Sequence, residues 1–145
     1  MITISRPGVA AIMCKRTSEG IRFLIIRHVT GKNTFVSGGL KRGETREQCL
    51  RREFKEEIGL SGDDILSMRD MGSVSSFVAN WFFVAIDFQY HDFLVEARSG
   101  FEPRRSLEVR RFWWLDYRAA LAALSGETRR ALFARICNLF GLAAS

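Results

Sequence analysis

The stretch GGLKRGETREQCLRREFKEEIGL, residues 38–60, holds the features that most strongly decide the fold of this sequence. Thr45 and Gln48 have the spacing of a capping box, and Gly59 stands where a helix commonly ends. Between these ends an apolar stripe recurs at the helical period: Leu50, Phe54 and Ile58. The stretch therefore predicts a helix from Thr45 to Ile58.

Three glutamates crowd the last turns of this helix. Glu53, Glu56 and Glu57 are three and four residues apart from the first to the others, so they share one side, where like charges repel. Arg52, four residues before Glu56, is well placed to pair, but negative charge near a helix C-terminus is unfavourable. A divalent cation would neutralise the cluster, and Mg²⁺ prefers carboxylate oxygens combined with substrate phosphates.

The loop before the helix has the composition of a phosphate site. It combines glycines with cations: Gly38, Gly39, Gly43, Lys41, Arg42 and Arg46. Glycine lets the backbone turn sharply and present N–H groups to an anion, and the cations add positive charge. We therefore expect an anion site beside the metal site, in which Gly38, Gly39 and Lys41 bind substrate.

Outside this stretch, strands and helices are mixed without a repeating βα period. Segments 8–15 and 21–28 are rich in β-branched residues and predict a hairpin. Further strands are predicted at Ile65–Met71, at Val74–Gln89, which an interruption could divide, and at Glu108–Leu115. Helices are predicted at Tyr117–Leu124 and Glu127–Phe140. The order indicates a layered α+β or α/β domain.

The composition indicates one globular domain over residues 1–145. The chain is 47% hydrophobic and 26% charged, and its strongly apolar run at 81–86 is far too short to cross a bilayer. The start, MITISRPG, lacks the apolar core of a signal peptide, and three widely spaced cysteines suit reduced core thiols. We expect a cytoplasmic protein with no membrane contact.

The net charge of +6 favours an anionic partner, although solubility alone also explains it. Several basic side chains could flank a cleft and bind phosphates: Arg16, Arg22, Arg27, His28 and Lys32. Of these we assign Arg27 to the substrate. Phe35, Trp81 and Trp113 could stack on a base, but aromatic residues in strands are more often core, and we expect at least two of the three there.

Residues 38–60 resemble the Nudix box of the Nudix hydrolases at nearly every constrained position. The matching residues are Gly38, Glu44, Arg52, Glu53, Glu56, Glu57, Gly59 and Leu60, with Phe54 at a usually aliphatic position. Many members of that family carry Pro before the paired glycines, where this chain has Ser37. This departure affects the loop and leaves the catalytic pattern intact.

The resemblance implies an α/β/α sandwich around a mixed β-sheet, with a divalent metal, Mg²⁺ or Mn²⁺. It implies that Glu53, Glu56 and Glu57 are metal ligands, that Glu44 is a supporting carboxylate and that Arg52 orients the cluster. The family often adds an acidic residue outside the box. Glu108, shortly before FWWL, is the first candidate for it, with Glu96 and Glu102 behind; Glu108 could instead pair with Arg110 or Arg111.

The function expected from this resemblance is hydrolysis of the diphosphate bond in a nucleoside diphosphate linked to another group, by water attack on phosphorus. Nucleoside triphosphates, nucleotide sugars and dinucleoside polyphosphates all fit. Two alternatives stay open: a nucleotide-sensing module without turnover, and a pyrophosphohydrolase acting on RNA 5′ ends, although no aromatic-rich RNA motif supports the latter. A homodimer is plausible.

Overall fold

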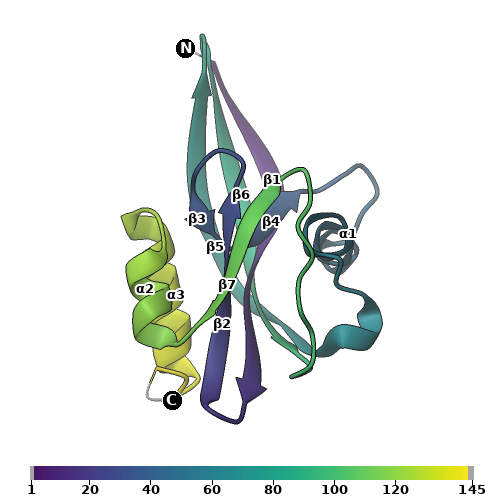
Figure 1. The fold of residues 1–145 in the computed structure, drawn as a ribbon. Helices are drawn as coiled ribbons and strands as arrows, with labels where there is room; N and C mark the ends of the chain where they lie inside the picture. Colours follow the sequence, from purple (N-terminus) through teal and green to yellow (C-terminus); the bar gives the residue numbers. More distant parts are fainter. Residues whose placement is uncertain (1, 144–145) are drawn as a thin grey trace.

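The computed structural model describes residues 2–143 and shows three layers (Figure 1). The central layer is a seven-stranded mixed sheet, in which β3, β2, β1, β6 and β5 lie in that order while β4 pairs with β1 and β7 with β2. The strands are β1 (Ile2–Thr17), β2 (Gly20–His28), β3 (Asn33–Thr34), β4 (Val36–Gly39), β5 (Ile65–Trp81), β6 (Val84–Ala97) and β7 (Val109–Leu115). The expected α/β/α sandwich around a mixed sheet is confirmed.

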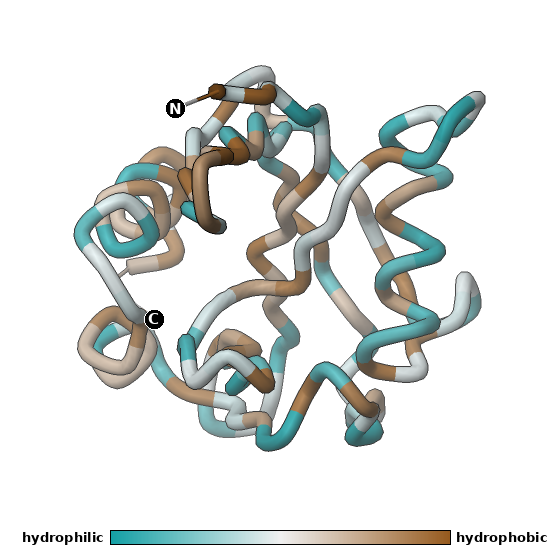
Figure 2. The backbone as a smooth tube through the Cα atoms, turned by 90° about the horizontal axis from the view of Figure 1, so that it is seen from above, coloured by the Kyte–Doolittle hydropathy of each residue, from teal (hydrophilic) through white to brown (hydrophobic). Residues whose placement is uncertain are grey.

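Helices cover both faces of the sheet. Figure 2, seen from above, shows α1 (Arg46–Ile58) on one side and α2 (Tyr117–Ala123) with α3 (Glu127–Leu139) on the other. A short 3₁₀ turn, η1 (Gly62–Asp64), follows α1. The core accordingly has two clusters, one on each face of the sheet. Leu50, Phe54 and Ile58 of α1 belong to the first, and Phe133 and Ile136 of α3 belong to the second.

The predicted helix in residues 38–60 is confirmed together with both of its ends. The Thr45 hydroxyl accepts from the Gln48 amide at 3.1 Å, and the Gln48 side chain accepts from the Thr45 amide at 2.9 Å. Gly59 caps the other end at φ 71°, a conformation that glycine adopts without strain. The preceding loop differs from prediction, because Gly38 and Gly39 lie in β4, paired with Gly8 and Val9 of β1.

The predicted hairpin of β1 and β2 and the two closing helices are confirmed, with β1 beginning already at Ile2. The predicted strand segment Val74–Gln89 is interrupted, an alternative that the sequence left open, and it belongs to two strands, β5 and β6. The chain turns at Phe82 and Phe83, and Trp81 pairs with Val84 across the turn. No Gly, Asn or Pro stands there, so the sequence carries no turn signal. Conversely, β5 continues through Gly72, where a register shift replaces the predicted break.

The three cysteines, Cys14, Cys49 and Cys137, are free and buried, as expected. Burial raises the pKa of each thiol, to about 11 for Cys14 and Cys49 and to about 12 for Cys137. No helix in residues 2–143 is long and apolar enough to span a membrane.

Candidate active site

Glu57 is the buried centre of the candidate site. Glu57 is only 3% exposed, and its Oε2 atom has no hydrogen-bond partner within the described part of the chain. The helix places Glu57 one turn after Glu53, which is also buried. A buried carboxylate oxygen without a partner is costly, so a ligand or a proton is expected to satisfy it.

The pKa values of the two buried glutamates, Glu53 and Glu57, are both raised. Burial raises the pKa of Glu57 to about 9, and the negative charges of Glu53 and Glu108 add to the effect, as does a hydrogen bond with Glu53. Burial likewise raises the pKa of Glu53, while Arg52 opposes that shift. In the absence of a cation, the cluster therefore retains a proton at neutral pH.

Arg52 binds the cluster from the loop side. Its Nε donates to Glu44 Oε2 at 2.6 Å and its Nη2 to Glu44 Oε1 at 2.9 Å, which is a two-pronged carboxylate contact. The same guanidinium donates to Glu53 Oε1 at 2.7 Å, to the Gly39 carbonyl at 3.0 Å and, weakly, to Glu56 at 3.4 Å. Arg52 thus joins the β4 backbone to the glutamate side of α1.

Glu44 belongs to this network and is kept ionised by it. The hydrogen bond from Arg52 and then the Lys41 backbone amide, at 2.7 Å, lower the pKa of Glu44 to about 2. The hydrogen bond from the Lys41 amide to the Glu44 carboxylate also closes the turn between β4 and α1. Glu56 differs from its neighbours, since its side chain is 54% exposed.

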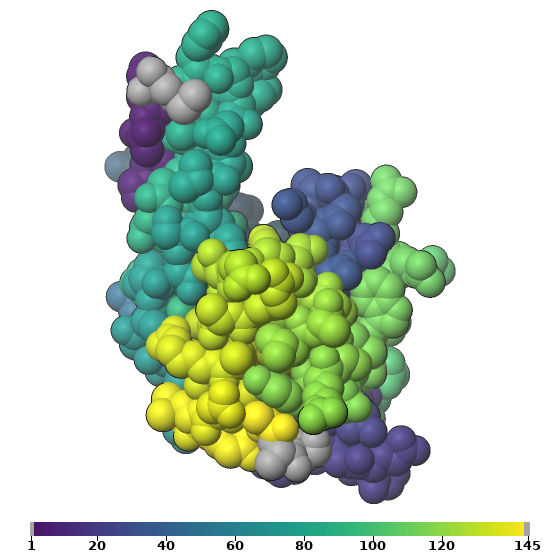
Figure 3. Space-filling model, turned by 90° about the vertical axis from the view of Figure 1, so that its left-hand side faces the viewer, coloured from purple at the N-terminus to yellow at the C-terminus, as the bar shows by residue number. Residues whose placement is uncertain are grey.

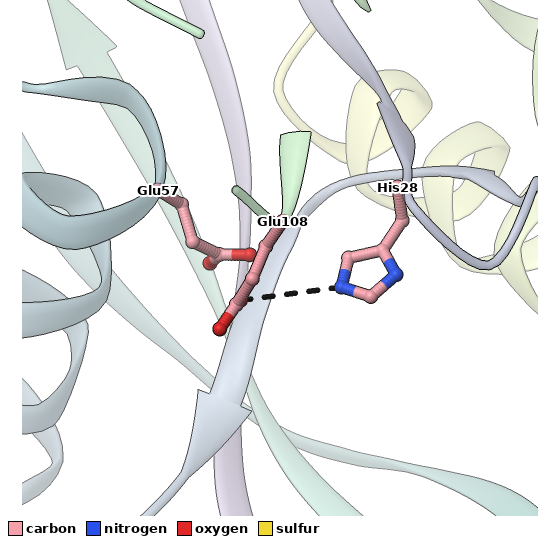
Figure 4. A group of neighbouring side chains, drawn as sticks. All are labelled: His28, Glu57 and Glu108. Atoms are coloured by element: carbon pink, nitrogen blue, oxygen red, sulfur yellow. Dashed lines mark ion pairs between the residues drawn. The ribbon is translucent and has the colours of Figure 1, made fainter. Parts of the chain in front are cut away.

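Glu108 and His28 approach Glu57 from the other side of the site. One ligand atom of each of these three residues lies within 4.8 Å of the others (Figure 4). His28 Nε2 lies 4.0 Å from Glu108 Oε2, and its Nδ1 accepts from the Thr30 amide at 3.3 Å. Because His28 Nδ1 accepts the hydrogen bond from the Thr30 amide, a neutral His28 carries its proton on Nε2, which faces Glu108.

The two weaker alternatives to Glu108 are engaged elsewhere. Glu96 pairs with Arg16 at 3.5 Å, and Glu102 pairs with buried Lys15 at 2.7 Å. Glu108 lies next to His28, at 4.0 Å. The alternative interpretation of the sequence had paired Glu108 with Arg110 or Arg111. Among the three acidic residues, Glu108 is thus the one that the structure brings to Glu57.

A cleft of about 650 Å³ opens beside Glu57. Figure 3 shows it as a hollow between the teal β5–β6 hairpin and the blue segment after β2. Its lining comes from the end of β2 and the segment after it, β4, α1, the β5–β6 hairpin and α3. The lining residues are His28, Thr30, Lys32, Ser37, Glu57, Phe77, Val78, Ala79, Phe88, Tyr90 and Arg129. The volume lies within the range of small-molecule sites, and the mixture of apolar walls with a few polar groups is typical of them.

Two predicted substrate-binding side chains lie outside the cleft lining. Arg27 donates to Asn33 Oδ1 at 2.7 Å and lies over the Trp113 ring, and Lys41 is held through its backbone by Glu44. Arg22 lies 3.5 Å from Glu19, also away from the cleft. Of the five cations considered on the sequence, His28 and Lys32 line the cleft.

The aromatic wall of the cleft was not predicted. Phe35 is core and Trp113 packs against the core, as expected for two of the three rings, while Trp81 is exposed. The rings at the cleft are instead Phe77, Phe88 and Tyr90; Phe88 and Tyr90 are stacked with centroids 5.6 Å apart.

Arg129 of α3 completes this wall. Its guanidinium lies 4.6 Å from the centre of the Phe77 ring, and its Nε donates to Thr34 Oγ1 at 2.8 Å. Burial lowers its pKa. No local sequence signal could have found this contact, because Phe77 and Arg129 are 52 positions apart and meet only through the tertiary fold.

Comparison with known proteins agrees with this geometry. The chain is 49% identical over 47 residues to the NAD-capped RNA hydrolase NudC of Vibrio atlanticus, and 39% identical over 62 residues to the RNA pyrophosphohydrolase of Teredinibacter turnerae. These matches take in 32% and 41% of this chain, but only 16% and 34% of the two relatives.

A solved C. elegans Ap4A hydrolase has the same fold. The TM-score is 0.78 at 14% identity, over 94% of this chain and 98% of that one. The family model of the NUDIX domain matches residues 4–136, which is most of the chain and includes Glu53, Glu57 and Glu108. The protein therefore belongs to the NUDIX domain family, as the residues between Gly38 and Leu60 indicated.

Proposed function

We propose that this protein is a divalent-metal-dependent hydrolase that cleaves the diphosphate bond of a nucleoside diphosphate linked to another group. The observation that carries the proposal is Glu57, a buried carboxylate with an unpartnered oxygen beside Glu53 and Glu108, at the cleft. Such a group needs positive charge, and a metal-bound diphosphate supplies it where the cleft opens.

The residues fit a hard divalent cation. Glu53, Glu56 and Glu57 of α1 are the proposed ligands, and Mg²⁺ or Mn²⁺ suits these oxygen donors. Glu108, which has an oxygen within 4.8 Å of one of Glu57, would complete the set from the opposite side. Arg52 contacts one oxygen of Glu53, so the carboxylate is oriented while its other oxygen can serve a cation. When bound, the metal supplies charge neutralisation of the diphosphate and acidifies a water molecule.

The chain itself supplies positioning and a proton acceptor. A glutamate of the cluster takes the proton of the attacking water, since several carboxylates converge there. Lys32 and His28 are proposed to contact the phosphates, in place of Arg27 and Lys41, because they line the cleft. The rings of Phe77, Phe88 and Tyr90 offer apolar surface to the group beyond the diphosphate.

An RNA 5′ end is the second candidate substrate, supported by the names of the two curated relatives. Against it stands the charge of the cleft wall. The hairpin of β5 and β6 carries no Lys or Arg between Asp70 and Ala97, so it offers no row of cations to successive phosphates. We therefore place small nucleotide diphosphates first.

A sensing module without turnover is the third candidate, and three glutamates at hydrolase spacing argue against it. We also propose a cytoplasmic location, which the reduced state of the buried cysteines supports. A homodimer is likewise part of the proposal.

The first experiment is a release assay over nucleoside triphosphates, nucleotide sugars, dinucleoside polyphosphates and 5′-triphosphate RNA, with Mg²⁺, Mn²⁺ or EDTA. The expected result is metal-dependent cleavage of one nucleotide class, with weaker cleavage of RNA. Absence of turnover across the panel, together with tight binding of one compound, would instead establish the sensing module.

A further inference from the structure

The upper part of the β5–β6 hairpin, with the first residues of β1 beside it, rises beyond both helix layers (Figures 1 and 3). Strand pairing aligns side chains in rows across the three strands. One row is Ile2, Val84 and Trp81, and the next is Ile4, Ile86 and Ala79. Because directly paired residues point to the same side of a sheet, these six side chains form one face, which we call the ribbon face.

The ribbon face continues the sheet surface that α2 and α3 cover lower down. Along β1 it is in register with Ile12 and Cys14, which pack under those helices. Its lower border is the row of Arg6, Phe88 and Phe77, of which the two rings lie at the cleft wall. Within residues 2–143 no helix covers the ribbon face itself, and Ile2 and Trp81 are 66% and 69% exposed.

The opposite side of the same ribbon is polar. Gln89 donates to Asp87 Oδ2 at 2.7 Å, and Ser76 donates to the same carboxylate. The ribbon is thus amphipathic, with water-compatible groups on one side and an apolar surface on the other. Apolar surface arranged in this way, contiguous and on one side, marks an interaction site more strongly than scattered apolar residues do.

The turn at the ribbon's end adds two further exposed aromatic residues at a conformational cost. Phe82 is 82% exposed and has a φ of 52°, a left-handed conformation that costs a bulky residue about 1–2 kcal/mol. Glycine is the usual residue at such a turn position. Within its own chain the Phe82 ring contacts the exposed Trp81 ring, with centroids 5.7 Å apart. Contact of these rings with a partner would explain why the strained conformation is kept.

The charge of the ribbon selects the kind of partner. Residues 71–86 and 2–5 contain no charged side chain, in a chain with 22 Lys and Arg and 16 Asp and Glu. RNA and anionic membranes both require several cations, and this surface offers one, Arg6, in the border row with Phe88 and Phe77. An apolar face whose one cation lies at its border can pack on a copy of itself without like charges meeting, as an isologous contact demands.

The available area also suits self-association. Trp81, Phe82 and Phe83 together expose on the order of 400 Å² of aromatic surface, counting about 200 Å² for a whole ring side chain. The apolar residues of both rows add to this. A standard interface takes about 800 Å² from each partner, which is within reach of the face and its turn together.

We propose that the ribbon face is the interface of a two-fold symmetric dimer of this chain, packed sheet on sheet. With the axis at the row of Ile4, Ile86 and Ala79, the row of Trp81 in one copy lies over the row of Phe77 and Phe88 in the other, because both rows are two residues from the axis. The partner's Trp81 then borders the cleft. The association does not depend on the proposed hydrolase activity.

Sedimentation equilibrium tests the state of the full chain. The wild type is expected to be dimeric at about 10 µM, corresponding to the affinity range of a modest interface. The Trp81→Ser Phe83→Ser variant should be monomeric, whereas Leu107→Ser, which changes a residue 97% exposed outside the ribbon, should remain dimeric. A monomeric wild type, or a dimer unaffected by the Trp81→Ser Phe83→Ser variant, would overturn the proposal.

Cross-linking tests which face is used and where the axis lies. Ala79 and Asn80 are adjacent, exposed and on opposite faces of β5, and the natural cysteines are buried. Treated with a short bismaleimide, Ala79→Cys should form a cross-linked dimer, because two copies of this position face each other near the axis across stacked sheets about 10 Å apart, too far for a direct disulfide. Asn80→Cys should not. Equal cross-linking of both, or linkage through Asn80→Cys alone, would contradict the face and the axis proposed here.

Discussion

Gly38 of β4 lies directly against the Glu53 side chain of α1, so that a methyl group at position 38 would overlap the Glu53 carboxyl carbon. The neighbouring Gly39 has room, with the Pro7 carbonyl 3.9 Å from the place of an added Cβ. Gly38 is therefore required here for close approach, since its side chain would stand where a proposed metal ligand stands.

Gly38→Ala is expected to displace Glu53 and to destabilise the fold by about 1–3 kcal/mol, as overpacking does. Metal affinity should fall with it, because the displaced carboxylate no longer points to the site. Isothermal titration with Mn²⁺ and urea unfolding measure the two effects. Gly39→Ala is the matched control; if it proves as damaging as Gly38→Ala, the contact with Glu53 is not the reason for glycine.

Glu57→Gln is expected to lower kcat by about 10²–10⁴-fold, since a neutral amide neither binds a cation strongly nor accepts a proton. Unfolding in EDTA at about pH 8 should show no loss of stability, because the amide removes a buried group that is costly to ionise. Glu47→Gln, on the exposed side of the same helix, should leave kcat unchanged. Full activity of Glu57→Gln would remove Glu57 from the proposed site.

Arg52→Lys is expected to reduce metal affinity about 10–100-fold, the usual effect of removing a residue that orients ligands. Lysine keeps the charge but cannot reach Glu44, Glu53 and the Gly39 carbonyl with one planar group. Mn²⁺ titration gives the readout. Arg51→Lys, whose ion pair with Glu47 is exposed, serves as the comparison, and equal effects of both substitutions would argue against an orienting role.

Lys32→Ala is expected to raise KM for a diphosphate substrate about 10–100-fold, corresponding to the loss of one charge-assisted hydrogen bond. Lys41→Ala should change KM little, because the cleft lining includes Lys32 and not Lys41. Steady-state kinetics on both variants decides between them. The reverse order would return the phosphate contact to the loop that the sequence favoured.

Stability of the metal-free protein should depend on pH with opposite signs for two glutamates. Glu57 has a pKa raised from 4.5 to about 9, so its contribution is fully present below 4.5 and is lost as the pH rises through 9. Glu44 has a pKa lowered to about 2, so its contribution is present above 4.5 and is lost as the pH falls to 2. Stability from these two groups is therefore greatest near about pH 5.

Urea unfolding in EDTA at about pH 5, 7 and 9 measures this dependence. Adding Mn²⁺ should stabilise the protein increasingly as the pH rises, because ligands must lose their protons to bind. Glu57→Gln should flatten the decline on the alkaline side. An unchanged profile in that variant would show that other groups cause the decline.

The parts of the structure predicted from sequence are those fixed by local chemistry. The helix in residues 38–60 depends on a capping box, an apolar stripe and a terminal glycine, all within a few residues of one another. The same stretch predicted the proximity of Arg52 to the glutamates, because side chains four residues apart on a helix are neighbours. These inferences needed no knowledge of the remaining chain.

The cleft wall could not be predicted, because it is made by contacts between distant segments. Tyr90 and Arg129 reach the site from β6 and α3, and nothing near either residue in the sequence indicates a role. The hairpin turn escaped prediction for a different reason. Phe82 adopts a conformation that sequence rules assign to glycine, so the position of the turn within the apolar run could not be predicted.

The absence of Lys and Arg from residues 70–97 also shapes the electric field around the molecule. All 22 Lys and Arg residues lie outside this segment, which itself contributes four acidic residues: Asp70, Asp87, Asp92 and Glu96. An anionic nucleotide in solution is therefore attracted from the side of β2 and its following turn and not from the hairpin side. Its rate of encounter should fall as ionic strength rises, and the long-range field would orient the phosphate end toward Lys32 before any contact forms.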